Sequence, residues 1–238
     1  MTKVEIARLI LDFTHRLFMH HAFWFAEVQK KFGAERAYEI MQQVYETTSD
    51  IQLKRLAKIL EFDLNDGLPA PLVNMNDDEI GKLLEGISVN WLANDGVWFQ
   101  AVENAYDMAD AKHCNDNAWE QFSPFEAWSI KKHLNLPNNS GIEGLKKAFQ
   151  YRIYSFINKQ EIVEETENSF VFRMVDCRVQ AARKRKGLDD YPCKSGGMVE
   201  YTKFAETIDS RIKTECIACP PDNHPEEWYC AWRFKIED

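Results

Sequence analysis

An internal repeat in the first half of the chain limits its folds more than any other feature. Residues 4–60 align with residues 78–134 without a gap, at a constant offset of 74 residues. Trp24-Phe25 then faces Trp98-Phe99, and the apolar positions keep the same phase in both copies. This pattern indicates a duplicated structural unit.

Each copy of the repeat is predicted to be helical. Apolar residues recur at helical spacing over residues 6–18, and the same spacing returns over residues 80–92. Gly33 is expected to separate two helices in the first copy. Ser49 and Ser123 are expected to cap the start of a further helix in each copy.

The periodicity changes after the repeat. A helix is predicted over residues 141–160, and Ser195-Gly196-Gly197 is read as a turn. The remaining elements are predicted as strands over 161–166, 169–175, 211–217 and 227–236, and short helices over 179–186 and 198–208. The sequence therefore predicts an α+β protein: a duplicated helical domain over residues 1–160, then a smaller domain over 161–238 ordered hairpin, helix, helix, hairpin.

Charge and hydropathy exclude several classes of protein. The formal net charge is −9, which disfavours binding to nucleic acid. No run approaches the 18 or so apolar residues of a membrane span. The first residues resemble an amphipathic helix rather than a secretory signal, so we expect a cytoplasmic protein.

Four cysteines are candidates for a metal site. Cys216 and Cys219 form a C-x-x-C pair, and the prolines that follow can turn the chain back towards Cys230, while Cys193 lies in a preceding loop. Zinc takes four such thiolates in a tetrahedron and would then be structural, with no open position for water. An iron–sulfur cluster uses the same ligands, His224 could replace one sulfur, and free cysteines are often simply buried apolar residues.

The remaining two cysteines receive separate predictions. Cys177, at the end of a predicted strand, is an alternative ligand, a buried structural residue, or a nucleophile whose pKa is lowered by Arg178 and a helix N-terminus. Cys114 is expected in the core of an amphipathic helix.

Polar groups precede the aromatic pair in both copies of the repeat. His20 stands before Trp24, and Asp95 stands before Trp98 and Phe99. If the copies pack about a pseudo-two-fold axis, these five residues could form the walls and polar anchors of a ligand pocket.

Arg152 interrupts an aromatic helix. Three outcomes are open for its side chain: extension to solvent, which the pattern favours, pairing with a buried carboxylate, or binding of an anionic ligand.

Several motifs carry a resemblance that covers nearly the whole chain. They are Asp95-Gly96-Val97-Trp98-Phe99, Glu126-Ala127-Trp128, Tyr151-Arg152-Ile153-Tyr154, Cys177-Arg178, Lys186-Gly187-Leu188, Pro192-Cys193-Lys194, Glu215-Cys216-x-x-Cys219-Pro220-Pro221-Asp222 and Cys230-x-Trp232-x-Phe234. With these motifs the chain resembles an uncharacterised family of bacterial and archaeal cytosolic proteins. The C-terminal part is similar, more distantly, to the 4-vinyl-reductase domain and to aminothiazoline-carboxylate hydrolase-like proteins.

The resemblance to the 4-vinyl-reductase domain implies an α+β fold that binds a small molecule. Sensor members of that family hold a structural zinc with three cysteines and a glutamate. By position, Cys193, Cys219 and Cys230 match the cysteines, and Cys216 takes the place of the glutamate.

The sequence thus predicts a zinc-containing protein that binds a small-molecule ligand, and a homodimer is one expectation for its assembly. One alternative is a C–N hydrolase of cyclic amidine or amide substrates, in which Cys177 is the nucleophile or the metal is catalytic. Another is a protein-interaction module, which would expose a large apolar patch and have no closed pocket.

Overall fold

The computed structural model describes residues 1–187 and 189–237, and these form two compact units, residues 1–77 and 78–238. The fold class is α+β, as predicted. The units divide at the junction of the two repeat copies, whereas the predicted domain division at residue 160 stays a prediction. Leu188, part of one resemblance motif, lies outside the described residues.

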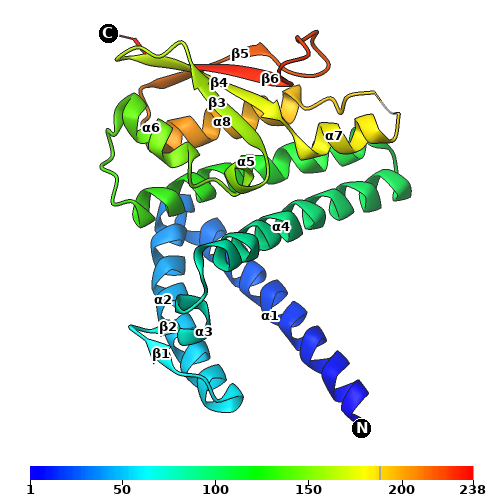
Figure 1. Cartoon of the computed structure of the whole chain (residues 1–238), viewed down its shortest axis with the longest axis vertical. Coiled ribbons are helices and arrows are strands. Elements are labelled where there is room, and N and C mark those ends of the chain that lie inside the picture. Colours follow the sequence, from blue (N-terminus) through cyan, green and yellow to red (C-terminus); the bar gives the residue numbers. More distant parts are fainter. Residues whose placement is uncertain (188, 238) are drawn as a thin grey trace. The chain divides into compact units, whose positions relative to one another are not determined.

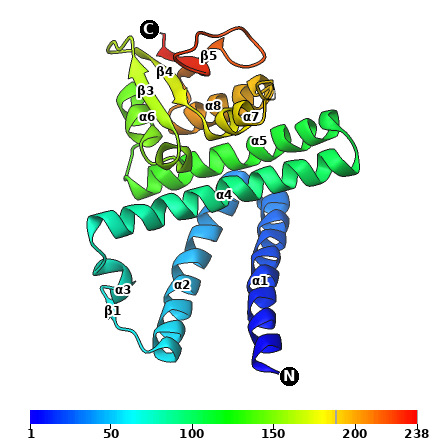
Figure 2. The same ribbon diagram turned by 45° about the vertical axis from the view of Figure 1, so that its right-hand side comes forward.

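Unit 1 is a pair of long helices followed by a small irregular segment. Helix α1 (Lys3–Phe32) starts with a capping box between Thr2 and Glu5, and Gly33 ends it with a positive φ of 83°. Helix α2 (Ala34–Leu60) follows, and then β1 (Leu64–Asn65), β2 (Leu68–Pro69) and the short helix α3 (Ala70–Val73). The two long helices diverge from Gly33 (Figure 2).

Unit 2 contains a second helix pair and an antiparallel sheet. Its elements are α4 (Asp77–Ala105), α5 (Met108–His133), α6 (Gly141–Phe149), a 3₁₀ turn (Ile153–Phe156), β3 (Lys159–Val163), β4 (Ser169–Asp176), α7 (Arg178–Arg185), α8 (Lys194–Ile208), β5 (Ile212–Ala218) and β6 (Cys230–Ile236). The strand order is β3-β4-β6-β5. Helices α6 and α8 cover one face of the sheet, and α5 packs along α8 (Figure 1).

The core of unit 2 lies between the sheet and these helices. Register pairs Phe172 with Trp232 and Phe170 with Phe234, so these four rings share the face that meets α8. Phe149 of α6 stacks on Phe172, with ring centroids 4.9 Å apart. All five side chains are buried, so this aromatic layer fixes α6 and α8 against the sheet.

The helix boundaries repeat with the same offset as the sequence. Helix α4 begins at Asp77, 74 residues after the start of α1 at Lys3, and α5 begins at Met108, 74 residues after the start of α2 at Ala34. Gly33 separates the helices of the first copy, as predicted. The two copies therefore share one helical hairpin pattern.

Three local predictions were wrong. Ser49 and Ser123 cap no helix, because α2 and α5 run through them, and the Ser123 hydroxyl instead donates to the Glu200 carbonyl at 2.5 Å. The helix predicted to reach residue 160 ends at Phe149, since Arg152 adopts an extended conformation to reach a buried partner. The predicted turn at Ser195-Gly196-Gly197 lies within α8, where a Cβ on Gly197 would come within 2.7 Å of the Trp232 ring.

Candidate functional site

A cavity of about 770 Å³ lies within unit 2. It is lined by residues of α4, α5, α7 and α8 and by the ends of β4 and β6. Its lining combines aromatic rings, including Phe99, Trp119, Tyr154, Tyr191 and Tyr201, with charged and polar side chains. Cavities of roughly 300–1,000 Å³ with such walls are typical of small-molecule sites.

Four thiols contribute to the lining of this cavity, namely Cys177, Cys193, Cys219 and Cys230. Cys177 and Cys193 stand directly before α7 and α8, Cys219 follows β5, and Cys230 begins β6. Separate elements therefore bring these sulfurs together although they are far apart in the sequence.

Cys219 is the centre of this group of thiols. Hydrogen bonding with Cys193 and Cys230, followed by burial, raises the pKa of the Cys219 thiol. The Gln180 side-chain amide donates to the Cys193 sulfur at 3.1 Å. An N–H donor of this kind orients a sulfur that could act as a metal ligand.

A tight turn after β5 positions Cys219. The Asp222 amide donates to the Cys219 carbonyl at 2.9 Å, and the Asp222 carboxylate accepts from Lys194 Nζ at 2.7 Å. The Lys194 amide in turn donates to the Pro220 carbonyl at 2.9 Å. These bonds fix the turn to the start of α8, directly beside Cys193.

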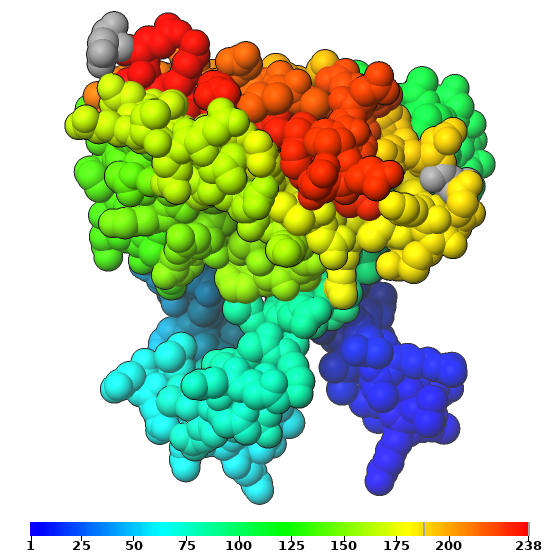
Figure 3. All heavy atoms as spheres, turned by 45° about the horizontal axis from the view of Figure 1, so that its top comes forward, coloured from blue at the N-terminus to red at the C-terminus, as the bar shows by residue number. Residues whose placement is uncertain are grey.

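The segment between β5 and β6 continues from this turn over the surface. Figure 3 shows it lying against the segment that contains α7. His224 Nε2 lies 2.9 Å from Asp190 Oδ2, and this contact joins the two segments. The imidazole therefore has a partner outside the cavity, and it does not line the cavity beside the thiols.

The structure divides the predicted zinc ligands. Cys193, Cys219 and Cys230 line the cavity together, while Cys216 does not line it and lies on β5 opposite Trp232. Cys177 lines the cavity instead. Among residues 1–187 and 189–237, no three His, Cys, Asp or Glu side chains are already placed as metal ligands would be.

Burial keeps two of these thiols in the neutral form. It raises the pKa of Cys177 to about 12 and that of Cys216 to about 11. Of the alternatives for Cys177, the nucleophile with a lowered pKa is therefore wrong, because burial outweighs the N-terminus of α7. Cys114 was expected in the core, but it is exposed on α5.

Asp95 and Phe99 are the two predicted ligand-binding residues that line the cavity. Burial raises the pKa of the Asp95 carboxyl group, which accepts a long hydrogen bond of 3.4 Å from Asn115. The Phe99 ring meets Tyr191 edge to face, with centroids 5.3 Å apart. Trp98, their neighbour, is 65% exposed and does not contribute to the lining.

His20 and Trp24 belong to unit 1. Both are exposed on α1, where their rings contact each other with centroids 6.5 Å apart. The cavity is lined by unit 2 residues, so neither side chain contributes to it. A pocket shared by both repeat copies remains a prediction.

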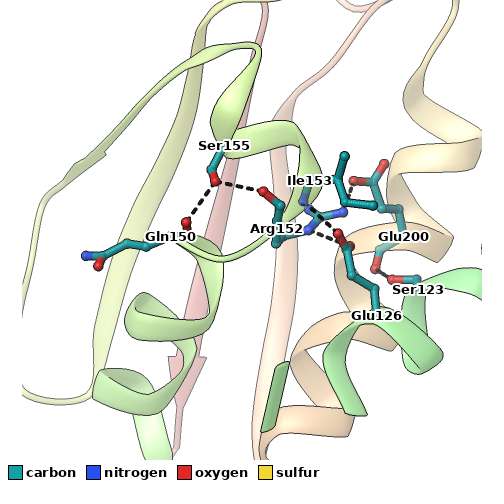
Figure 4. A network of polar contacts seen from close by, with 7 residues as sticks. All are labelled: Ser123, Glu126, Gln150, Arg152, Ile153, Ser155 and Glu200. Carbon is teal, nitrogen blue, oxygen red and sulfur yellow. Dashed lines mark hydrogen bonds and ion pairs between the residues drawn. The ribbon is translucent and has the colours of Figure 1, made fainter. Parts of the chain in front are cut away.

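Arg152 is held by two buried carboxylates beside the cavity. Its Nε donates to Glu126 at 3.0 Å and its NH2 group donates to Glu200 at 2.5 Å, while the Ile153 amide also donates to Glu126 (Figure 4). Burial alone would lower the pKa of the Arg152 guanidinium, but Glu126 and Glu200 outweigh it and raise that pKa. Extension to solvent, which the pattern favoured, is wrong, and pairing with a buried carboxylate is confirmed.

Glu200 connects this ion-pair network to the cavity, because its side chain also lines the cavity wall. Burial raises its pKa, although the neighbouring Arg152 opposes that shift. Sequence reasoning missed Glu200, and a signal was present: it stands on the otherwise apolar face of α8, beside Tyr201 and Phe204. A charged residue in such a stripe needs a partner.

No helix among the described residues is long and apolar enough to span a membrane. No curated protein and no solved structure matches the chain. These comparisons give no support to the expected likeness to the 4-vinyl-reductase domain or to hydrolase-like proteins.

One family profile, described as a family of unknown function (DUF6125), matches residues 1–80 and again residues 72–236. The second match begins near the start of the second repeat copy. Together the two matches cover nearly the whole chain, which agrees with the predicted membership of an uncharacterised family. The chain belongs to this family of unknown function, DUF6125.

Proposed function

We propose that the protein binds a small molecule in the cavity of unit 2. The observation that carries this proposal is the cavity itself, about 770 Å³ in volume and lined in part by aromatic rings. It is large enough for a ligand of one or two rings, and most of its lining comes from helices α4, α5, α7 and α8.

The lining supports a particular class of ligand. The rings of Phe99, Trp119 and Tyr191 favour a flat, largely apolar molecule. Asp95 and Glu200 add hydrogen-bond acceptors, and Arg178 and Arg183 of α7 add positive charge at another part of the lining. A planar molecule that carries a donor group such as an amine or amidine at one end and an acceptor or anionic group at the other would use these contacts together.

We further propose that the thiols of the cavity wall hold a structural zinc ion. Their donor chemistry fits zinc, because Cys193, Cys219 and Cys230 already interact and Gln180 donates to one of these sulfurs. Cys216, as predicted from sequence, or Cys177, which lines the cavity, would be the fourth ligand. Zinc bound there would cross-link β6, α8 and the turn after β5, and a closed thiolate shell would make it structural.

The alternative of a C–N hydrolase has less support. A cysteine nucleophile needs its thiolate form, and the pKa of Cys177 is raised to about 12. The partners that shift this pKa are backbone groups and other thiols, and no histidine is among them. Ligand binding without turnover is therefore the proposal that the lining favours.

Saturation-transfer NMR with phenol, indole and benzamidine tests the binding proposal. We expect transfer from the full-length protein to at least one of these fragments, and Phe99→Ala should weaken it. Trp98→Ala is the matched control, because Trp98 is a neighbouring but exposed ring. No transfer to any fragment, or equal loss in both variants, would contradict the proposal.

A further inference from the structure

Helix α1 displays an apolar stripe that nothing in unit 1 covers. Ile6, Ile10, Phe13, Leu17 and Trp24 follow one another at spacings of four, three, four and seven residues, so they share one face of the helix. Their exposures run from 43% to 64%, and no residue of Lys3–Phe32 is fully buried. With this stripe exposed to water, α1 would be only marginally stable, because an amphipathic helix is stabilised mainly by packing of its apolar face.

The shape of the helix pair explains why the stripe is open. Helices α1 and α2 diverge from Gly33 (Figure 2). Near that turn the rings of Phe25 and Tyr38 stack with centroids 5.9 Å apart. Farther along, α2 also presents exposed apolar side chains, including Tyr45, Leu56 and Ile59. Both helices of unit 1 therefore carry apolar side chains that the rest of the unit leaves exposed.

In the second copy of the repeat, other elements cover the apolar residues of the second helix. Trp119 and Ile130 of α5 are only 6% and 7% exposed: the Trp119 ring packs against Trp91 of α4 and Tyr154, and Ile130 belongs to the core that α5 shares with α8. The positions 74 residues earlier are Tyr45 and Leu56, which are also apolar but 62% and 46% exposed. Unit 1 contains no counterpart of α8 or of the segment around Tyr154, so the equivalent residues of α2 lack these partners.

We infer that a second copy of this chain covers these faces, and that two α1–α2 hairpins associate as a four-helix bundle. The five stripe residues of α1 with Tyr45, Leu56 and Ile59 are each about half exposed. At roughly 100 Å² each, they would bury about 800 Å² per protomer, which is what one partner contributes to a standard stable interface. A two-fold axis would bring the same apolar faces of two hairpins together, which is the usual arrangement in homodimers. This inference is independent of the cavity in unit 2.

The mass of the full-length protein in solution tests the inference. Light scattering after size exclusion should give twice the 27.8 kDa chain mass. Phe13→Asp and Leu17→Asp place a charge in the stripe and should raise the dissociation constant of the dimer more than about tenfold. His15→Asp is the matched control, because His15 is exposed on the opposite side of α1, and its dimer should be unchanged.

Hydrogen exchange of the α1 amides distinguishes the remaining outcomes. In a dimer, protection of α1 should increase with protein concentration. A monomer whose α1 is protected would mean that another part of the same chain covers the stripe, and a monomer with rapid exchange would mean that nothing in the purified protein does. Either result overturns the inference, as does a Phe13→Asp variant that keeps the dimer mass with unchanged far-UV circular dichroism.

Discussion

Arg152 Nε lies 3.0 Å from Glu126 Oε2, and this pair joins the segment after α6 to the middle of α5. Both side chains are buried, at 1% and 7% exposure. The same guanidinium binds Glu200 of α8, so one cation connects three parts of unit 2 beside the cavity. Removing it would leave two buried carboxylates without their partner.

Arg152→Met is therefore expected to lower the free energy of unfolding by about 3–5 kcal/mol, the usual cost of an unpaired buried charge. Urea unfolding followed by near-UV circular dichroism measures it. Lys82→Met is the control, since Lys82 pairs with Asp78 on the surface and its loss should cost less than about 1 kcal/mol. Equal effects of the two substitutions would show that the buried network does not stabilise unit 2.

Asp209 should make stability depend on pH in the acid range. Hydrogen bonds from Arg211, and a further one from the Gly141 amide, lower its pKa from the ordinary 3.8 to about 2. Because the folded pKa is the lower one, the stabilisation is present above pH 3.8 and is lost as pH falls towards 2. Asp209→Asn should flatten the fall in stability over this range, and the exposed Asp78→Asn should not, as measured by urea unfolding at successive pH values.

Thiol reactivity should separate Cys114 from the cysteines of the cavity. Cys114 is exposed, while burial raises the pKa of Cys177 to about 12 and leaves little of its thiolate at pH 8. With Ellman's reagent on the folded protein we expect one fast thiol, and Cys114→Ser should remove that fast phase. A fast phase that persists in Cys114→Ser would mean that a cavity thiol is accessible and ionised.

Metal analysis tests the zinc proposal and identifies the fourth ligand. Protein purified without chelator or added metal should contain about one zinc per chain, with four thiols protected until chelation. Cys219→Ser should lose the metal, and Cys114→Ser should keep it. Loss in Cys177→Ser with retention in Cys216→Ser would assign Cys177, and the reverse would assign Cys216. Absence of metal from the wild-type protein would contradict the proposal.

Sequence patterns predicted the helical repeat well, because helix boundaries depend on local signals that are duplicated. Gly33 ends α1 through its positive φ, and the apolar phase carries α4 and α5 to bounds that match the first copy. The prediction that Ser49 and Ser123 cap helices was wrong, because serine is also tolerated inside a helix. The Ser123 hydroxyl, for example, finds an acceptor in the Glu200 carbonyl.

The site was harder to predict, since it depends on contacts between distant segments. The C-x-x-C spacing pointed to Cys219, but which of Cys177 and Cys216 lines the cavity depends on strand register and on the bulge between Cys216 and Ala218. Arg152 was read as part of a continuous helix, and its extended backbone follows from Glu126, which is 26 residues away. Such tertiary partners leave no periodic signal in the sequence.

The central claim, that the cavity of unit 2 binds a ligand, is tested most directly by filling it. Gly96 lines the cavity on α4, and a Cβ at this position would meet no atom within 4 Å, so Gly96→Leu can place a side chain there. Gly86→Leu is the matched control, on the same helix with equally open space but away from the cavity. In the saturation-transfer assay, Gly96→Leu should abolish fragment binding while Gly86→Leu retains it. Binding that survives in a folded Gly96→Leu protein would show that the ligand lies elsewhere and would contradict the proposed site.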